Sequence, residues 1–145
     1  MKTVYYHDPL GDDFAGMDIQ AETLPADFPF ARSSLPWRIL SWLVYYCIAM
    51  PLVFLCSKLY LGLKIKNRRA LKPLRRSGYF LYGNHTRALD AFTPAMAAFP
   101  KAAFVTCSPD AVSIPGLRRL VQMLGGLPIP KDLAPMRGFL RAVEQ

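Results

Sequence analysis

The chain has 145 residues, of which 52% are apolar, 18 are Lys or Arg and 10 are Asp or Glu, so its formal net charge is +8. This length allows one ordinary domain, or a membrane anchor followed by a small domain. The apolar fraction excludes a disordered chain, and the 3 cysteines are too few for a scaffold held together by disulfides. The chain is therefore globular or attached to a membrane.

Residues 1–35 form an acidic leader. Six acids and two bases give this segment a charge of 2 − 6 = −4, whereas the remaining residues carry 16 − 4 = +12. Its Gly and Pro residues and its lack of a regular apolar period predict an irregular segment, and no basic region leads directly into an apolar stretch as in a signal peptide. We expect a loosely held tail. The alternative is docking onto the rest of the chain through its aromatic residues Tyr5, Tyr6, Phe14, Phe28 and Phe30.

Residues 36–63 contain a long apolar segment. All 19 residues from Ile39 to Ser57 are uncharged, and a helix of that length spans about 28 Å, close to the hydrocarbon thickness of a bilayer. Trp and Tyr residues flank the segment like interfacial anchors, and Pro51 is expected to kink the helix or divide it into a re-entrant hairpin. We therefore expect a membrane anchor, and the alternative is a buried core helix.

A basic cluster follows the apolar segment and continues through a linker over residues 64–78. The positive-inside rule places this flank in the cytoplasm, with the leader on the other side if the helix spans. The cluster would attract anionic headgroups by about 1 kcal/mol per base, so membrane lipids are the expected partners. Nucleic acid is not expected, because the neighbouring aromatic residues belong to the apolar segment. Eight bases and no acid make up the cluster: Lys58, Lys64, Lys66, Arg68, Arg69, Lys72, Arg75 and Arg76.

The remaining residues, 79–145, alternate between strand and helix patterns. Such alternation predicts a parallel sheet with right-handed crossovers, whose ligands bind beyond the carboxyl ends of the strands. The fold class is therefore α/β, with a membrane helix or hairpin followed by an incomplete parallel β-α-β sheet. Strands are predicted at 79–82, 102–106 and 127–129, and helices at 91–99, 117–124 and 136–143.

A histidine and a carboxylate follow the first predicted strand. His85 emerges at the strand end, and Asp90 comes five residues later, near the start of a helix. In a turn, the carboxylate can accept the Nδ1 proton of the imidazole and leave Nε2 free to act as a base. Because no serine stands in a nucleophile-elbow pattern, we expect the nucleophile to be a substrate alcohol. The alternative is a capping aspartate beside a histidine without a chemical role.

The block Asn84-His85-x4-Asp90, after an apolar anchor and a strand, resembles the first motif of the glycerolipid acyltransferases, typified by 1-acylglycerol-3-phosphate acyltransferase. The resemblance covers about residues 36–131. It implies that His85 is the general base that activates the glycerol hydroxyl and that Asp90 orients it. An acyl thioester on coenzyme A or acyl carrier protein would be attacked directly, without a covalent acyl-enzyme, a metal or another cofactor.

Residues 126–131 resemble the second block of the same family, which usually ends in an arginine near the phosphate. Lys131 would be the corresponding cation. The acceptor implied is a lysophospholipid such as 1-acylglycerol-3-phosphate. Arg87 stands where the family often has a small hydroxyl residue, and so adds a phosphate contact or changes substrate preference. Across the two blocks, the implied substrate contacts are Asn84, Thr86, Arg87, Gly126 and Lys131.

The third family block, a Glu-Gly-Thr-Arg-like segment, is missing from the sequence. Residues 79–145 would then be a partial acyltransferase domain, and we expect the N-terminal part of a longer membrane-bound enzyme of phospholipid synthesis, inactive alone, with its site on the cytoplasmic face. One alternative is a non-catalytic membrane-surface module that binds anionic lipids. Another is a thioesterase with Cys107 as the nucleophile, although a small buried residue at a strand end is the simpler interpretation.

Overall fold

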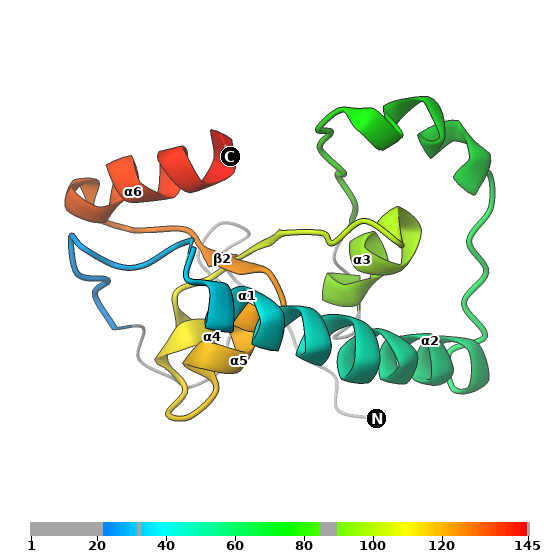
Figure 1. Ribbon diagram of the computed structural model, residues 1–145, viewed down its shortest axis with the longest axis horizontal. Helices are drawn as coiled ribbons and strands as arrows, with labels where there is room; N and C mark the ends of the chain where they lie inside the picture. The colour runs from blue at the N-terminus through cyan, green and yellow to red at the C-terminus, as the bar shows by residue number, and fades with distance from the viewer. Residues whose placement is uncertain (1–21, 32, 85–89, 145) are drawn as a thin grey trace, which may run out of the picture.

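A computed structural model of the protein describes residues 22–31, 33–84 and 90–144. One long helix lies on one side of a small two-stranded sheet, and a basic linker forms a separate arm (Figure 1). The elements in chain order are α1 (Leu35–Trp42), η1 (Leu43–Ala49), α2 (Met50–Leu59), η2 (Arg68–Leu71), η3 (Pro73–Arg76), η4 (Asp90–Phe92), α3 (Thr93–Ala98), β1 (Val105–Cys107), α4 (Asp110–Ser113), α5 (Arg118–Met123), β2 (Gly126–Pro128) and α6 (Leu133–Glu144).

The apolar segment is one continuous helix from Leu35 to Leu59, made of α1, η1 and α2. Its 25 residues correspond to about 37 Å. The prediction of a possible hairpin at Pro51 is therefore wrong. Pro51 has no N–H for the carbonyl of Cys47, and the helix widens into a π-helical turn, η1, just before it instead of breaking.

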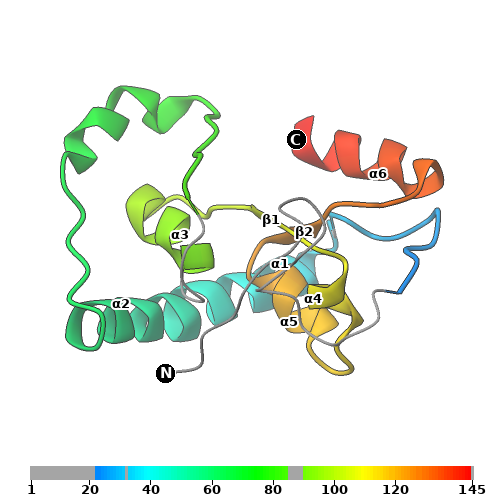
Figure 2. The same cartoon turned by 180° about the vertical axis from the view of Figure 1, so that it is seen from behind.

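The two strands β1 and β2 pair in parallel, with Val105 opposite Gly126 and Cys107 opposite Pro128. Figure 2 shows them side by side, with α4 and α5 forming the crossover between them. Two of the three predicted strands are thus confirmed, with boundaries shifted by a few residues. The α/β class and the parallel pairing are confirmed as well.

The strand predicted at 79–82 is not formed. These residues have no regular secondary structure, and the side chains of Phe80 and Tyr82 are 74% and 92% exposed. A strand needs a neighbouring strand to satisfy its backbone N–H and C=O groups. No described segment pairs with residues 79–82, so their aromatic character is not enough to make them a strand.

The three helices predicted after residue 90 are confirmed as α3, α5 and α6. Gly125 ends the turn after α5 with a positive φ of 85°, which glycine adopts without steric cost. Its carbonyl accepts a hydrogen bond from the N–H of Val105 at 2.9 Å. The predicted Gly125-Gly126 stop is therefore the point where the helix ends and the chain turns into β2.

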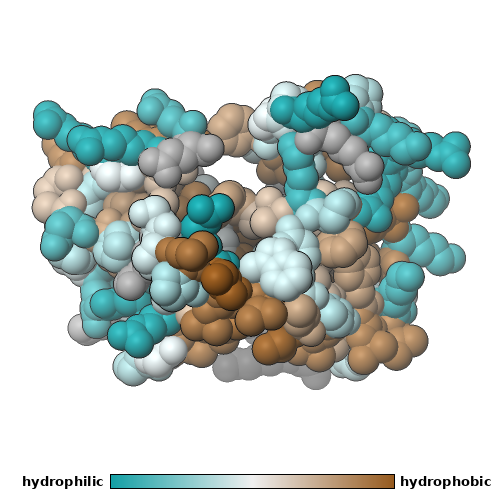
Figure 3. Space-filling model, viewed as in Figure 1, coloured by the Kyte–Doolittle hydropathy of each residue, from teal (hydrophilic) through white to brown (hydrophobic). Residues whose placement is uncertain are grey.

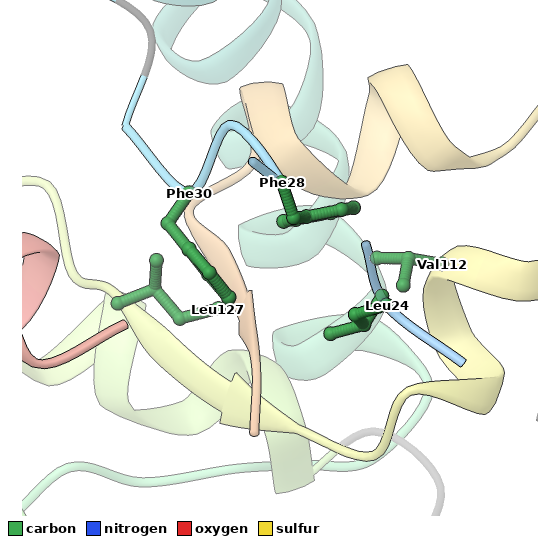
Figure 4. Close-up of a cluster of buried hydrophobic side chains, with 5 residues drawn as sticks. All are labelled: Leu24, Phe28, Phe30, Val112 and Leu127. Carbon is green, nitrogen blue, oxygen red and sulfur yellow. The ribbon is translucent and has the colours of Figure 1, made fainter. Parts of the chain in front are cut away.

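The leader is docked where the structure describes it. Leu24, Phe28 and Phe30 are buried and form one core cluster with Val112 of α4 and Leu127 of β2 (Figure 4). The ring centroids of Phe28 and Phe30 lie 4.9 Å apart in an edge-to-face arrangement. The expectation of a loosely held tail is therefore wrong for residues 22–31, because their apolar side chains cover the small α/β unit and help to make its core.

A second core cluster joins the long helix to α3. Tyr45 and Met50 are buried there against Ala95 and Met96. The hydroxyl of Tyr45 also accepts a hydrogen bond from the N–H of Ala103 at 3.1 Å. One stripe of the long helix thus packs against the rest of the protein. Many apolar side chains on its other faces are exposed.

Candidate functional site: a predicted motif, a basic cavity and an apolar face

The predicted catalytic block falls partly outside the described residues. His85, Thr86 and Arg87 belong to the undescribed part, so the pairing of His85 with Asp90 stays a prediction. Asn84 is exposed and irregular, and Asp90 is half-buried as the first residue of η4. Asp90 thus stands immediately before α3, the position that the sequence predicted for it.

The second predicted block lies on and after β2. Gly126 opens β2, and a Cβ at this position would collide with the Val121 side chain, so this glycine is required by packing. Lys131 is exposed and lines a small pocket with Glu22 and Pro109. Because Pro109 comes just after β1, the structure brings Lys131 close to the carboxyl ends of the strands, where parallel sheets bind ligands.

A larger cavity, of about 580 Å³, lies between the basic linker and the C-terminal end of α3. Among the described residues that line it, four are bases and none is an acid. The sequence predicted the positive charge of the linker but not the cavity. The cavity forms only because the fold brings Lys101, about thirty residues further along the chain, beside the linker bases. The polar and aromatic residues of its wall that the structure describes are Arg68, Arg69, Lys72, Tyr79, Phe99 and Lys101.

Two of these bases are held in place by backbone carbonyls. Arg68 donates from Nε to the carbonyl of Ala97 at 3.2 Å and from Nη2 to the carbonyl of Phe99. Lys101 donates from Nζ to the carbonyl of Ser77 at 2.7 Å. The last carbonyls of a helix lack intrahelical donors, so Arg68 satisfies groups that α3 leaves free.

The other two bases are not paired with any residue that the structure describes. Neither Arg69 nor Lys72 makes a side-chain hydrogen bond or ion pair with the described residues, and both are exposed. Lys101 also lies over the ring of Tyr79, with its Nζ 5.3 Å from the centroid. The cavity therefore combines fixed cations, free cations and an aromatic wall.

The long helix presents a broad apolar face. Only one stripe of the helix is buried. Of its apolar 18-residue window, 11% is buried inside the protein, whereas a core helix is mostly buried. The described part of the chain has one helix that is long and apolar enough to cross a membrane, judged by length and composition. In Figure 3 apolar side chains gather along the lower edge, where α1 and α2 run. The large exposed residues are Leu35, Ile39, Leu40, Trp42, Leu43, Ile48, Leu52, Leu55 and Leu59.

Segments before and after the long helix pack on each other. The Phe30 and Phe139 ring centroids are 5.9 Å apart, and Gln122 donates to the carbonyl of Pro29 at 2.9 Å. Residues 22–31 and the α/β unit therefore lie on one side of the helix. The expectation that a spanning helix would separate the leader from the rest is wrong for this part of the leader.

Cys107 has the properties of a structural residue. It is half-buried at the end of β1, and burial raises the pKa of its thiol to about 11. A nucleophilic cysteine needs a lowered pKa, because the thiolate is the reactive form. Among the described residues, no group of three or more His, Cys, Asp or Glu is placed to hold a metal ion.

Comparisons with protein-family models, with curated proteins and with solved structures find no match for this chain. A functional proposal therefore depends on the residues themselves. Those residues are the Asn84 to Asp90 block, the basic cavity and the apolar face of the long helix.

Proposed function

We propose that the protein is a membrane-bound acyltransferase. It would move a fatty acyl group from an acyl thioester, on coenzyme A or acyl carrier protein, to the hydroxyl of a lysophospholipid such as 1-acylglycerol-3-phosphate. The block Asn84-His85-x4-Asp90 carries this proposal. Support comes from its place immediately before α3, within a chain that also has a parallel β-α-β unit.

In the proposed reaction, His85 takes the proton of the acceptor hydroxyl as its oxygen attacks the thioester carbonyl. The ester C–O bond forms, the C–S bond breaks, and the proton passes from the imidazolium to the leaving thiolate. Asp90 orients the imidazole and stabilises its charged form. Lys131 and Arg87 supply positive charge for the phosphate of the acceptor.

The exposed apolar face supports attachment of the long helix along the membrane surface. Because residues 22–31 and the α/β unit pack together, both ends of the long helix lie on the same side of any bilayer that it contacts. We therefore place the helix in the plane of the interface, with its apolar face in the acyl region and its buried stripe on α3. We propose that this surface is the cytoplasmic leaflet, whose anionic lipids attract bases such as Lys58 at the end of the helix.

The test is transfer of a radiolabelled acyl group from acyl-CoA to 1-acylglycerol-3-phosphate, with the chain expressed in its full natural reading frame. We expect His85→Ala to lower the rate by about 10²- to 10⁴-fold, the usual contribution of a general base. Glu144→Gln, which changes an exposed carboxylate outside the motif and outside the pocket of Lys131, is the matched control and should keep the parental rate. An unchanged rate in His85→Ala would refute the proposed mechanism.

A second candidate is a non-catalytic module that binds anionic membranes. The exposed apolar helix beside eight bases favours it, since both features act without any chemistry at His85. Sedimentation with vesicles separates the two candidates. The module predicts tight binding to anionic vesicles together with no acyl transfer in any variant.

A further inference from the structure

We propose that the cavity between the basic linker and α3 is a binding site for the phosphate groups of a water-soluble small molecule, such as a nucleoside polyphosphate. The lining residues that the structure describes are all outside the Asn84 to Asp90 block, and the proposal does not depend on the acyltransferase proposal. Its described walls come from residues 68–72, from Tyr79, and from residues 97–101 at and after the end of α3.

The charges of the cavity indicate an anionic ligand. Its described lining includes Arg68, Arg69, Lys72 and Lys101 but no acid, and no described residue forms an ion pair with Arg69 or Lys72. Like charges held close together repel, and a bound anion relieves that repulsion. The planar guanidinium of Arg69 matches two phosphate oxygens, while the ammonium of Lys72 acts as a point charge.

The framework of the cavity is preorganised. Arg68 ties η2 to the end of α3, and Lys101 ties the residues after α3 to the carbonyls of Leu74 and Ser77. These bonds fix the two walls before any ligand arrives. A ligand that enters would therefore order only the side chains of Arg69 and Lys72, and this lowers the conformational entropy lost on binding.

The position of the cavity favours a soluble ligand over a headgroup of the bilayer. In Figures 1 and 2 the helical turns η2 and η3 of the linker lie apart from α2, with α3 between them. Figure 3 shows hydrophilic side chains over the linker and apolar side chains along the opposite edge. A bilayer in contact with the apolar face would lie on the far side of α3. The linker bases that line the cavity are therefore turned away from the headgroups that the sequence had suggested for them.

Calorimetric titration of the full chain, in uncharged detergent micelles, with sodium pyrophosphate tests the site. We expect saturable binding that is weakened at least tenfold by the double change Arg69→Ala and Lys72→Ala. The control is Lys64→Ala with Lys66→Ala, which removes the same formal charge from exposed positions outside the cavity and should bind like the parent. Circular dichroism should show the same helical signal for all three proteins.

Vesicles of phosphatidylcholine with and without phosphatidic acid distinguish the source of the phosphate. We expect the Arg69 and Lys72 double variant to bind anionic vesicles as well as the parent does. Loss of vesicle binding in that variant would assign the cavity to lipid headgroups and overturn the proposal for a soluble ligand. Absence of pyrophosphate binding, or equal weakening in the Lys64 and Lys66 control, would overturn the site itself.

Discussion

The ring of Phe30 packs edge to face on the ring of Phe139, and so connects the segment before the long apolar helix to the last helix of the chain. Gly138 makes this contact possible, because a Cβ there would lie 3.2 Å from Cδ2 of Phe30. Residues 22–31 of the leader are thereby part of the folded unit, and they hold the N-terminal end of the apolar helix against the α/β unit.

Phe30→Ala should destabilise the protein by about 3–5 kcal/mol, because it removes a buried ring and leaves a cavity between the leader and α6. Phe30 is 8% exposed, whereas Phe80 is 74% exposed. Phe80→Ala is therefore the matched control, and its unfolding free energy should stay within about 0.5 kcal/mol of the parent. Urea unfolding in detergent micelles measures both, and equal stabilities for the two variants would contradict the docking of the leader.

Gly125→Ala should also destabilise the protein, by about 2 kcal/mol or more, since it adds a side chain to a residue with positive φ. Its Cβ would lie 2.6 Å from the carbonyl oxygen of Ala103, so the turn that aligns β2 with β1 must shift. Gly78→Ala is the control, because nothing lies within 4 Å of its added Cβ. If both variants unfold at the same urea concentration, the described turn is wrong.

Local patterns were sufficient to predict most of the helices and the parallel strand pair. The amphipathic period over 117–124, followed by two glycines, marked α5 and its end, because both signals depend on neighbouring residues only. The prediction at 79–82 failed for the opposite reason. A strand exists only with a partner, and no local pattern shows whether residues 79–82 have one.

Contacts between segments far apart in the sequence could likewise not be predicted from local patterns. The burial of Phe28 and Phe30 depends on Val112 and Leu127, so composition alone favoured a loose leader. The charge of the linker was evident from the sequence, whereas the cavity needed Lys101 to be brought beside it. Residues 85–89 lie outside the described part of the chain, and the roles of His85, Thr86 and Arg87 remain sequence-based predictions.

The docked leader leads to a prediction about membrane topology. Two variants each carry a single cysteine at an exposed position, Thr23→Cys in one and Lys131→Cys in the other. Both cysteines should react with a membrane-impermeant maleimide from the same side of sealed vesicles. The background is the chain with Cys47, Cys56 and Cys107 changed to Ala, which should not be labelled. Labelling of the two positions from opposite sides would show that the helix spans the bilayer, and would contradict the in-plane placement.

Cys107 should react slowly with iodoacetamide, and its reaction should depend steeply on pH. Burial raises its pKa to about 11 from an ordinary 9.0, so at pH 8 only about one thiol in a thousand is ionised, roughly a hundredfold fewer than in the unfolded chain. We expect the rate to rise about tenfold per pH unit between pH 8 and 10, because the thiolate is the reacting form. The protein used is the Cys47→Ala and Cys56→Ala variant, and the same protein in urea is the control. Rapid alkylation of the folded protein at neutral pH would instead indicate an activated thiol, and it would revive Cys107 as a nucleophile.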